Sequence, residues 1–522
     1  MANHKLKAEG SEQKAAAACS CRLPPSAFRL LHSPRLLLCA LCVSVVLTAG
    51  CGRKSPPAAP EAAFQPPTCR GDILLAPEPR FTRAGRPVLG PGPAGSWDAV
   101  DVMNPTLAEG AGRLLMLYSG FDGRLWRTGL AVSTDGAKWE KRPGPVLESS
   151  PSGWDSEYIA ANGSALFFKG KFYYWYQGGR DDRVRIGLAT SADGERWTKH
   201  PGPVLAAGPP GAWDSEAVAD PFVLACGETL FLYYLGQDQK QVQRLGVASS
   251  ADGIHWTRYG RNPVLDVSSG SFDERGLGEP AVIPVAGGLA MFYTGRDARE
   301  FRRIGLALSP DGLAWRKAGV ALDVAPSGWD SRVVADPHVM AAGNRLLLYY
   351  GGGDVASPDE NLHGRIGLAT APVERGFRLE FAEASVRPAE PRGDTPNGRW
   401  AFPYEKDSLV TLARAAATFS IEVPPKARFR AAVAMPLAGA GPARALVRID
   451  RHEVFSREVS AGANRAVPPS RMSERFVEID LDLAPYAGKK VQLELAALPG
   501  PGGERGSWVQ WRNPRIVKES KP

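Results

Sequence analysis

The chain has 522 residues, of which 44% are hydrophobic and 23% are charged, a balance that excludes a disordered chain and allows two or three folded domains. Its formal net charge is +8, but residues 1–50 hold six Lys or Arg against two Asp or Glu, so half of the excess lies there. Since no basic run follows that could track a phosphate backbone, we expect no nucleic-acid partner. The 57 Gly and 45 Pro, with aromatics along the whole length, predict short strands and tight turns.

The N-terminus has the pattern of an export signal. An apolar stretch from Leu36 to Gly50 follows Arg35, and its fifteen residues are too few to span a bilayer comfortably. Leu47 to Cys51 (LTAGC) resembles the bacterial lipobox, in which the cysteine is lipidated and becomes the mature N-terminus. The resemblance implies a signal peptide at 1–50, lipidation of Cys51 and a Pro/Ala-rich tether at 51–71. The protein is then extracytoplasmic and lipid-anchored to a bacterial membrane; the alternative, a buried core helix, does not suit the stretch after Cys51.

Removal of residues 1–50 and lipidation of Cys51 would leave two other cysteines in the mature chain. A single disulfide between Cys69 and Cys226 is compatible with export, although no spacing rule implies it.

One pattern then returns five times with a period of 57 to 59 residues. Each copy opens with an aromatic residue and Asp: Trp97-Asp98, Trp154-Asp155, Trp213-Asp214, Phe272-Asp273 and Trp329-Asp330. An apolar stretch, a Leu/Tyr-rich strand ending in Gly and a third strand follow. In four copies the motif Ser-x-Asp-Gly-x-x-Trp leads to a fourth strand, at 133–139, 191–197, 250–256 and 309–315, and its Asp-Gly pair predicts a type I′ turn. Four strands in each of five units predict a five-bladed β-propeller over residues 72–385.

The ring needs a strand to close it. Residues 80–83 (RFTR) with 87–89 (PVL) resemble residues 196–199 (RWTK) with 203–205 (PVL) of the second copy. Residues near 80–84 are therefore predicted to complete the fifth blade, with residues 377–380 (FRLE) as the competing candidate.

After the repeats, residues 386–396 are predicted to be a linker and residues 397–517 a second domain. Alternating apolar and polar runs at 418–423, 476–481 and 491–495, separated by Pro/Gly turns, are typical of a β-sandwich. The final run at 508–514 (WVQWRNP) resembles the last strand of jelly-roll domains attached to carbohydrate enzymes, although its tryptophans would also fill a sandwich core. The predicted fold class is all-β.

Residues that recur in every copy are interpreted as architectural, among them the Asp of each aromatic-Asp pair. A site can form where the copies differ. Seven residues after the aromatic, the chain has Asn104, Ala161, Asp220, Glu279 and Asp336, four of them followed by Pro. This pattern resembles the five-bladed glycosidase superfamily of families 32, 43, 62, 68 and 130, in which inner-strand carboxylates, often in Asp-Pro motifs, meet in a central funnel. The resemblance implies a carbohydrate substrate and no cofactor, and allows a calcium ion on the axis by analogy only.

Cleavage of a glycoside needs a protonated carboxylic acid and an ionised carboxylate. The hypothesis from the sequence is Glu279 as general acid, with Asp336 or Asp220 as base and the other as an orienting group, since clustered carboxylates raise one another's pKa. The candidate ligand-contacting residues are Asn104, Asp101, the sugar-stacking Trp97, Trp154, Trp213 and Trp329, and, for phosphate or an acidic sugar, Arg180, Arg296 and His338. The repetition of the tryptophans favours packing for them.

One departure from the resemblance leaves the function open. Families 32 and 43 usually carry Asp, Asp and Glu in the first three blades, where this chain has Asn104, Ala161 and Asp220. A glycoside hydrolase is the first hypothesis. The alternatives are a non-catalytic glycan-binding surface lipoprotein and a glycoside phosphorylase.

Overall fold

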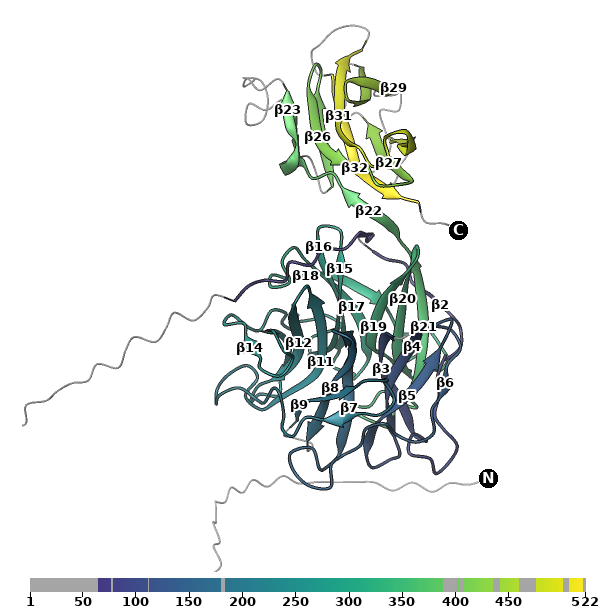
Figure 1. The fold of residues 1–522 in the computed structure, drawn as a ribbon, viewed down its shortest axis with the longest axis vertical. Helices are drawn as coiled ribbons and strands as arrows, with labels where there is room; N and C mark the ends of the chain where they lie inside the picture. The colour runs from purple at the N-terminus through teal and green to yellow at the C-terminus, as the bar shows by residue number, and fades with distance from the viewer. Residues whose placement is uncertain are drawn as a thin grey trace, which may run out of the picture. The chain divides into compact units, whose positions relative to one another are not determined.

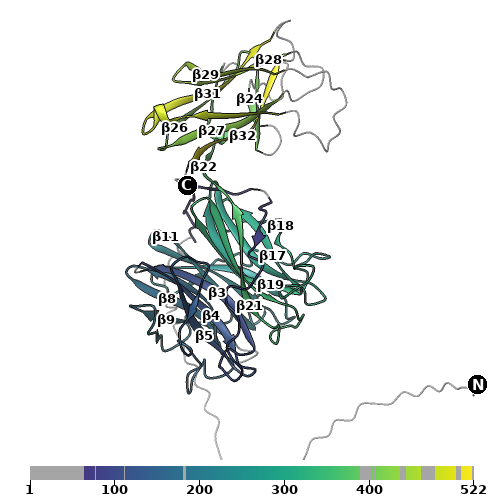
Figure 2. The same cartoon turned by 90° about the vertical axis from the view of Figure 1, so that its right-hand side faces the viewer.

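The computed structural model describes residues 64–76, 78–110, 112–179, 184–387, 401–403, 407–434, 442–459, 476–500 and 507–519, whose regular secondary structure is almost entirely β-strand (Figures 1 and 2). The predicted signal peptide, Cys51 and most of the predicted linker lie outside these residues. Two short 3-10 helices, η1 (Phe381–Glu383) and η4 (Ala484–Tyr486), interrupt the strands. No helix within the described ranges has the length and apolar character needed to cross a membrane.

Five antiparallel blades of four strands form the larger part of the fold. Blade 1 contains β3 (Asp101–Gly110), β4 (Arg113–Phe121), β5 (Trp126–Ser133) and β6 (Glu140–Lys141). Blade 2 contains β7 (Ile159–Phe168), β8 (Lys171–Gly179), β9 (Arg185–Ser191) and β10 (Thr198–Lys199). Blade 3 contains β11 (Ala217–Cys226), β12 (Thr229–Gln237), β13 (Gln243–Ser250) and β14 (Thr257–Arg258). Blade 4 contains β15 (Gly276–Val285), β16 (Gly288–Arg296), β17 (Arg302–Ser309) and β18 (Arg316–Leu322).

Blade 5 takes its outermost strand from the start of the fold. It contains β19 (Val333–Ala342), β20 (Arg345–Gly353), β21 (Arg365–Pro372) and β2 (Thr82–Arg83). β2 pairs antiparallel with β21, with Thr82 opposite Thr370. The prediction that residues near 80–84 close the ring is therefore confirmed. The competing segment lies instead around β22 (Glu374–Arg378), which pairs with β1 (Ile73–Leu74) and with β32 (Trp508–Lys518).

The repeated Asp of each aromatic-Asp pair ties its blade together. Its buried carboxylate accepts hydrogen bonds of 2.5–3.2 Å from a Tyr hydroxyl on the second strand and from a cation on the fourth. The sets are Asp98 with Tyr118 and Lys141, Asp155 with Tyr176 and Lys199, Asp214 with Tyr234 and Arg258, Asp273 with Tyr293 and Lys317, and Asp330 with Tyr350 and Arg83. The architectural interpretation of these carboxylates is confirmed.

The aromatic partner of each Asp packs inside its own blade. Trp97 stacks on Tyr118 with a centroid separation of 5.8 Å, and Trp329 stacks on Tyr350 at 5.6 Å. A Cβ added to Gly120 would lie 2.3 Å from the Trp97 ring, so this glycine near the end of β4 leaves room for the indole. The structure therefore shows a packing role for these tryptophans, as their recurrence in the repeats favoured.

The Asp-Gly connections differ from the predicted type I′ turn. In blade 1 only Gly136 has positive φ (+72°), and Asp135 does not share it. The loop is held by side chains instead, because Asp135 Oδ1 accepts the N–H groups of Ala137 and Lys138 at 2.8 Å and Ser133 Oγ accepts that of Gly136 at 2.9 Å. The type I′ prediction is therefore wrong.

The C-terminal strands form two sheets around a shared apolar core, so the predicted β-sandwich is confirmed. One sheet contains β1, β22, β32, β24 (Ala401–Pro403), β25 (Ser408–Leu412), β27 (Ala427–Ala434) and β30 (Val477–Asp482). The other contains β23 (Ser385–Arg387), β26 (Ala416–Glu422), β31 (Lys490–Pro499), β28 (Ala443–Ile449) and β29 (His452–Val459). Trp511 is fully buried among Phe419, Phe429 and Leu493, and its indole N–H donates to Thr411 Oγ1 at 2.9 Å. This tryptophan fills the core.

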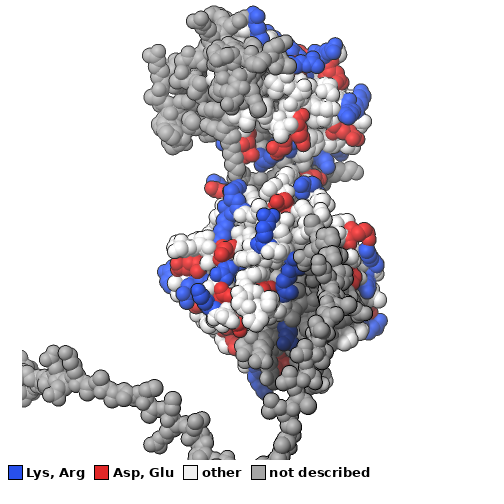
Figure 3. Space-filling view, turned by 90° about the vertical axis from the view of Figure 1, so that its left-hand side faces the viewer, with Lys and Arg blue, Asp and Glu red and all other residues white. Residues whose placement is uncertain are grey.

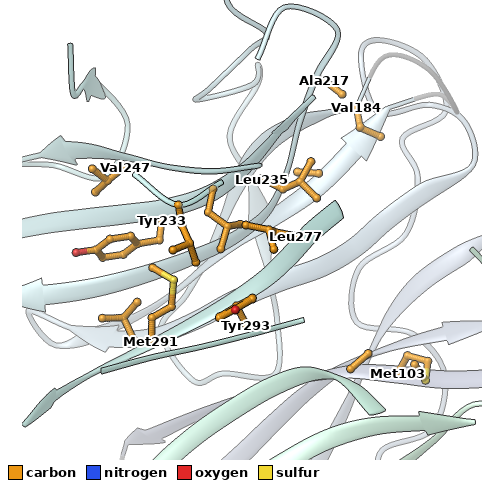
Figure 4. Packing of buried hydrophobic residues seen from close by; sticks show 14 of the residues in the cluster. Met103, Val184, Ala217, Tyr233, Leu235, Val247, Leu277, Met291 and Tyr293 are labelled. Carbon is orange, nitrogen blue, oxygen red and sulfur yellow. The ribbon is translucent and has the colours of Figure 1, made fainter. Parts of the chain in front are cut away.

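Adjacent blades are joined by apolar packing. Tyr233 and Val247 of blade 3 lie in one buried cluster with Met291 and Tyr293 of blade 4 (Figure 4). A disulfide connects Cys69, in the segment before β1, to Cys226 at the end of β11, as the export hypothesis allowed.

On the face in Figure 3, Lys and Arg side chains are interspersed with Asp and Glu.

Removing the cation that closes the ring should destabilise the propeller. Arg83 Nε lies 2.8 Å from Asp330 Oδ2, whose side chain is only 4% exposed. Arg83→Met keeps the apolar stem but leaves this carboxylate without its cation, and should lower the free energy of unfolding by about 1–3 kcal/mol. The exposed pair Arg113–Glu195 provides the control, because Arg113→Met should cost less than about 1 kcal/mol. Urea unfolding measures both, and equal losses would contradict the closing role.

Candidate functional site

Five residues in the innermost strands share an unusual backbone conformation. They have left-handed φ angles: Asn104 (50°), Asn162 (45°), Asp220 (46°), Glu279 (45°) and Asp336 (53°). Each lies where the pairing with the second strand shifts register. Such φ values are costly for residues other than Gly, and they concentrate at functional sites. We call these five residues the ring.

The blade 2 member of the ring corrects the sequence alignment. Counting seven residues from Trp154 gave Ala161, but the register shift between Ala161 and Ser164 makes Asn162 equivalent to Asn104. Blade 2 has one more residue before the kink, which is accommodated by the left-handed Tyr158 (φ 58°). The departure from the family pattern is therefore smaller than predicted, because a polar side chain stands where an alanine was expected.

The ring separates two cavities. On one side is a funnel of about 1130 Å³, which all five ring residues help to line. On the other is a small cavity of about 30 Å³, which the same five residues also line. The funnel is slightly larger than the usual binding site for a drug-sized ligand, and its floor is the ring.

Two of the ring carboxylates are fixed by the backbone of the next blade. Glu279 N–H donates to Asp220 Oδ2 at 3.4 Å, and Asn104 N–H donates to Asp336 Oδ2 at 3.0 Å. In blades 1 and 4 a hydroxyl accepts this bond, since Asn162 N–H donates to Ser119 Oγ and Asp336 N–H donates to Thr294 Oγ1, both at 3.0 Å. Because Thr294 accepts the N–H of Asp336, the carboxylate of Glu279 is not needed to fix the backbone of the next blade.

The electrostatics separate the three carboxyl groups further. Burial, reinforced by the neighbouring Glu279, raises the pKa of Asp220 to about 8. Burial and the same Glu279 also raise the pKa of Asp336 well above its usual range, although Arg302 opposes both shifts. Glu279 Oε2 is buried and has no hydrogen-bond partner. The ring therefore holds a proton on Asp220 at neutral pH and presents one unpaired carboxyl oxygen on Glu279.

Asn162 supports Asp220 and was missed by the sequence analysis. Its side chain hydrogen-bonds to Asp220 and lowers the pKa of that carboxyl, against the larger effect of burial. Ser119 Oγ in turn donates to Asn162 Oδ1 at 2.7 Å. The missed signal was the extra residue in blade 2, which shifts the motif by one position.

Asp101 is not available to a ligand, so its predicted contact is wrong. Its buried carboxylate accepts backbone N–H groups from Asn361, Leu362 and Gly364, at 2.7, 3.3 and 2.7 Å. These bonds hold the segment between β20 and β21, from which Glu360 Oε2 accepts the Tyr158 hydroxyl at 2.6 Å. Asp101 thus positions a loop that joins blade 5 to blade 2 at the funnel wall.

The predicted anion-binding residues divide into three cases. Arg296 does line the funnel, where Nη2 donates to Gln243 Oε1 at 3.3 Å and Nη1 lies 3.4 Å from Glu300. Arg180 lies outside the described residues. His338 lines only the small cavity, and burial lowers its pKa to about 4, so it is neutral and its predicted role as an anion-binding cation is wrong.

The predicted sugar-stacking tryptophans line neither cavity. They pack within the blades, so the stacking hypothesis is wrong for Trp97, Trp154, Trp213 and Trp329. Within the part of the chain that the structure describes, no group of three or more His, Cys, Asp or Glu is arranged to hold a metal ion.

Comparison with known proteins finds relatives that match part of this chain. An uncharacterized protein from Mycobacterium tuberculosis (strain CDC 1551 / Oshkosh) is 30% identical over 201 residues, covering 36% of this chain and 61% of that protein. A second strain of the species has a relative matching to the same extent, so the chain spans about three fifths of the curated relatives it matches. A similar solved structure is a putative glycoside hydrolase from Bacteroides ovatus ATCC 8483, with TM-score 0.45, 19% identity and coverage of 56% of this chain and 96% of that chain.

Blades 2 and 3 carry the match to a family profile. Residues 159–265 match the profile described as beta-1,4-mannooligosaccharide phosphorylase. This segment includes Asn162 and Asp220 of the ring. Blades 2 and 3 are therefore similar to the profile of glycoside hydrolase family 130, which is one of the families that the sequence pattern resembles.

Proposed function

We propose that the protein is a glycoside hydrolase that cleaves a neutral oligosaccharide in the propeller funnel. The observation that carries the proposal is the ring, which brings Asp220, Glu279 and Asp336 to the floor of one cavity and raises the pKa of two of them. Cleavage of a glycosidic bond needs one protonated and one ionised carboxyl group in one cleft.

The proton distribution favours roles opposite to those suggested by the sequence. Asp220, whose raised pKa keeps a proton near neutral pH, suits the general acid that protonates the departing glycosidic oxygen. Glu279 raises the pKa of both neighbours by its charge, and its unpaired Oε2 suits the base that takes a proton from the attacking water. Asp336, fixed by Asn104 N–H, is the tuning group.

Export to an extracytoplasmic, lipid-anchored location is part of the proposal. The lipobox-like sequence ending at Cys51 would attach the mature chain to a membrane, and residues 51–71 would tether it. The Cys69–Cys226 disulfide supports an oxidising compartment. Mass spectrometry of the mature N-terminus tests the lipid on Cys51.

A phosphorylase is the second candidate, because the matching family profile is described as one. Phosphorolysis needs a cationic site for inorganic phosphate. The described residues lining the funnel include six acidic side chains and three arginines: Glu216, Asp220, Glu279, Asp336, Asp359, Glu360, Arg185, Arg296 and Arg302. Arg296 contacts Gln243 and Glu300, and Arg302 donates to the carbonyls of Ser357 and Pro358. This distribution favours water over phosphate as the attacking group.

A glycoside panel assayed with and without phosphate separates the candidates. Cleavage that does not depend on phosphate is expected, and products bearing phosphate would support the phosphorylase. Binding of a sugar without cleavage under either condition would support the non-catalytic glycan-binding alternative.

Leaving-group chemistry should distinguish the acid from the base. Asp220→Asn should lower kcat/KM for an unactivated oligosaccharide by roughly 10²–10⁴-fold, but should change it little for the 2,4-dinitrophenyl glycoside, which departs without a proton. Glu279→Gln should impair both substrates. Glu216→Gln, which removes another funnel carboxylate, is the matched control and should retain activity. The reverse pattern, with Glu279→Gln sparing the activated glycoside, would restore the roles suggested by the sequence.

The buried Asp220 should also reduce stability as the pH rises. Its pKa is raised from 3.8 to about 8 in the folded protein, so its proton-linked contribution is fully present below about pH 4 and is lost as the pH rises toward 8. Asp220→Asn stays neutral and should exceed the parent in free energy of unfolding at pH 8 by more than about 1 kcal/mol, with no such gain at pH 4. Urea unfolding at both pH values measures the difference, and a gain independent of pH would contradict the raised pKa.

A further inference from the structure

One position on the second strand differs in every blade and determines how the ring is supported. It is the residue opposite the one that precedes the kink: Ser119, Gln177, Leu235, Thr294 and Gly351. Ser119 and Thr294 accept the ring N–H of the next blade. Leu235 and Gly351 have no side-chain acceptor, and the ring Asp of their own blade accepts that N–H instead.

Gln177 follows neither arrangement. Its Oε1 is buried and has no hydrogen-bond partner, while the side chain lines the funnel together with Asn162 and Asp220. A buried amide oxygen without a partner is costly, and in native proteins such groups are rare. An acceptor left open beside the proposed acid therefore points to a partner that comes from outside the protein.

Two further buried polar atoms of the funnel lack partners. Glu279 Oε2 is an acceptor and Arg296 Nε is a donor, and both residues line the same cavity as Gln177. Acceptors and a donor distributed around one cavity match a ligand with several hydroxyl groups, because each hydroxyl both donates and accepts. A neutral sugar has this chemistry.

We propose that Gln177 is a specificity residue whose Oε1 accepts a hydrogen bond from a hydroxyl group of the sugar that binds above Asp220. The inference rests on the proposed function for the position of the scissile bond, but the sugar contact itself needs no cleavage. It predicts that the site rejects a sugar lacking that hydroxyl, because Gln177 would then remain buried and unpaired.

The test measures binding in a protein that does not turn over its ligand. In the Glu279→Gln background, isothermal titration calorimetry with β-1,4-mannobiose, cellobiose and the monodeoxy analogues of the tighter of the two defines the hydroxyl that contributes to affinity. Adding Gln177→Leu, which keeps the size but removes the amide, should weaken binding of the parent disaccharide by roughly 10–100-fold. One monodeoxy analogue should bind both proteins equally well.

Gln237→Leu is the matched control, because Gln237 also lines the funnel but its amide already donates to Gln241 Oε1. This substitution should change the affinity less than threefold. Thermal unfolding verifies that each variant is folded. Unchanged binding and unchanged discrimination against the deoxy sugar in Gln177→Leu would overturn the role of Gln177 even if the parent cleaves glycosides. Gln177-dependent binding in a parent that cleaves nothing would overturn the hydrolase and leave the inference standing, and no binding of either disaccharide to the folded proteins would overturn the inference.

Discussion

The structure depends on a buried carboxylate that is repeated five times. In each blade it receives a Tyr hydroxyl from the second strand and a cation from the fourth, so one charged group connects strands that do not pair with each other. An uncompensated charge at less than 5% exposure would be strongly destabilising, so each cation is needed where it is. Because this network holds every blade in the same way, the inner strands are free to differ at the kink.

That freedom lets the ring combine support with chemistry. Ser119 and Thr294 accept the ring N–H of the next blade, so the ring residues of their own blades need not do so. Asp220 and Asp336 accept that N–H themselves and also have raised pKa values. Glu279 belongs to the blade in which Thr294 accepts the N–H, and it is the ring carboxylate with an oxygen left unpaired. The division of roles among the three carboxyl groups thus follows from which residue stands opposite the kink on the second strand.

The repeated features were predicted well from the sequence, because a residue that recurs at the same place in five copies can be told apart from chance similarity. The blades, the closing strand and the architectural Asp all follow from residues that recur at a fixed spacing. Prediction failed where the outcome depends on one copy or on distant contacts. A single extra residue before Asn162 displaced the blade 2 motif to Ala161, and Asp101 binds backbone N–H groups some 260 residues away, which no spacing reveals. The raised pKa of Asp220 depends on burial, which sequence alone does not give.

The strand β2, which completes the fifth blade and closes the propeller, has a consequence for the order of folding. Arg83 and Asp330 are separated by 247 residues, so the last blade cannot be completed from neighbouring sequence as the other four can. Contacts of such high sequence separation form late, because the entropy of closing the intervening loop must be overcome first. The propeller therefore behaves topologically as a circle joined at one seam, and its five blades should be lost together rather than one at a time.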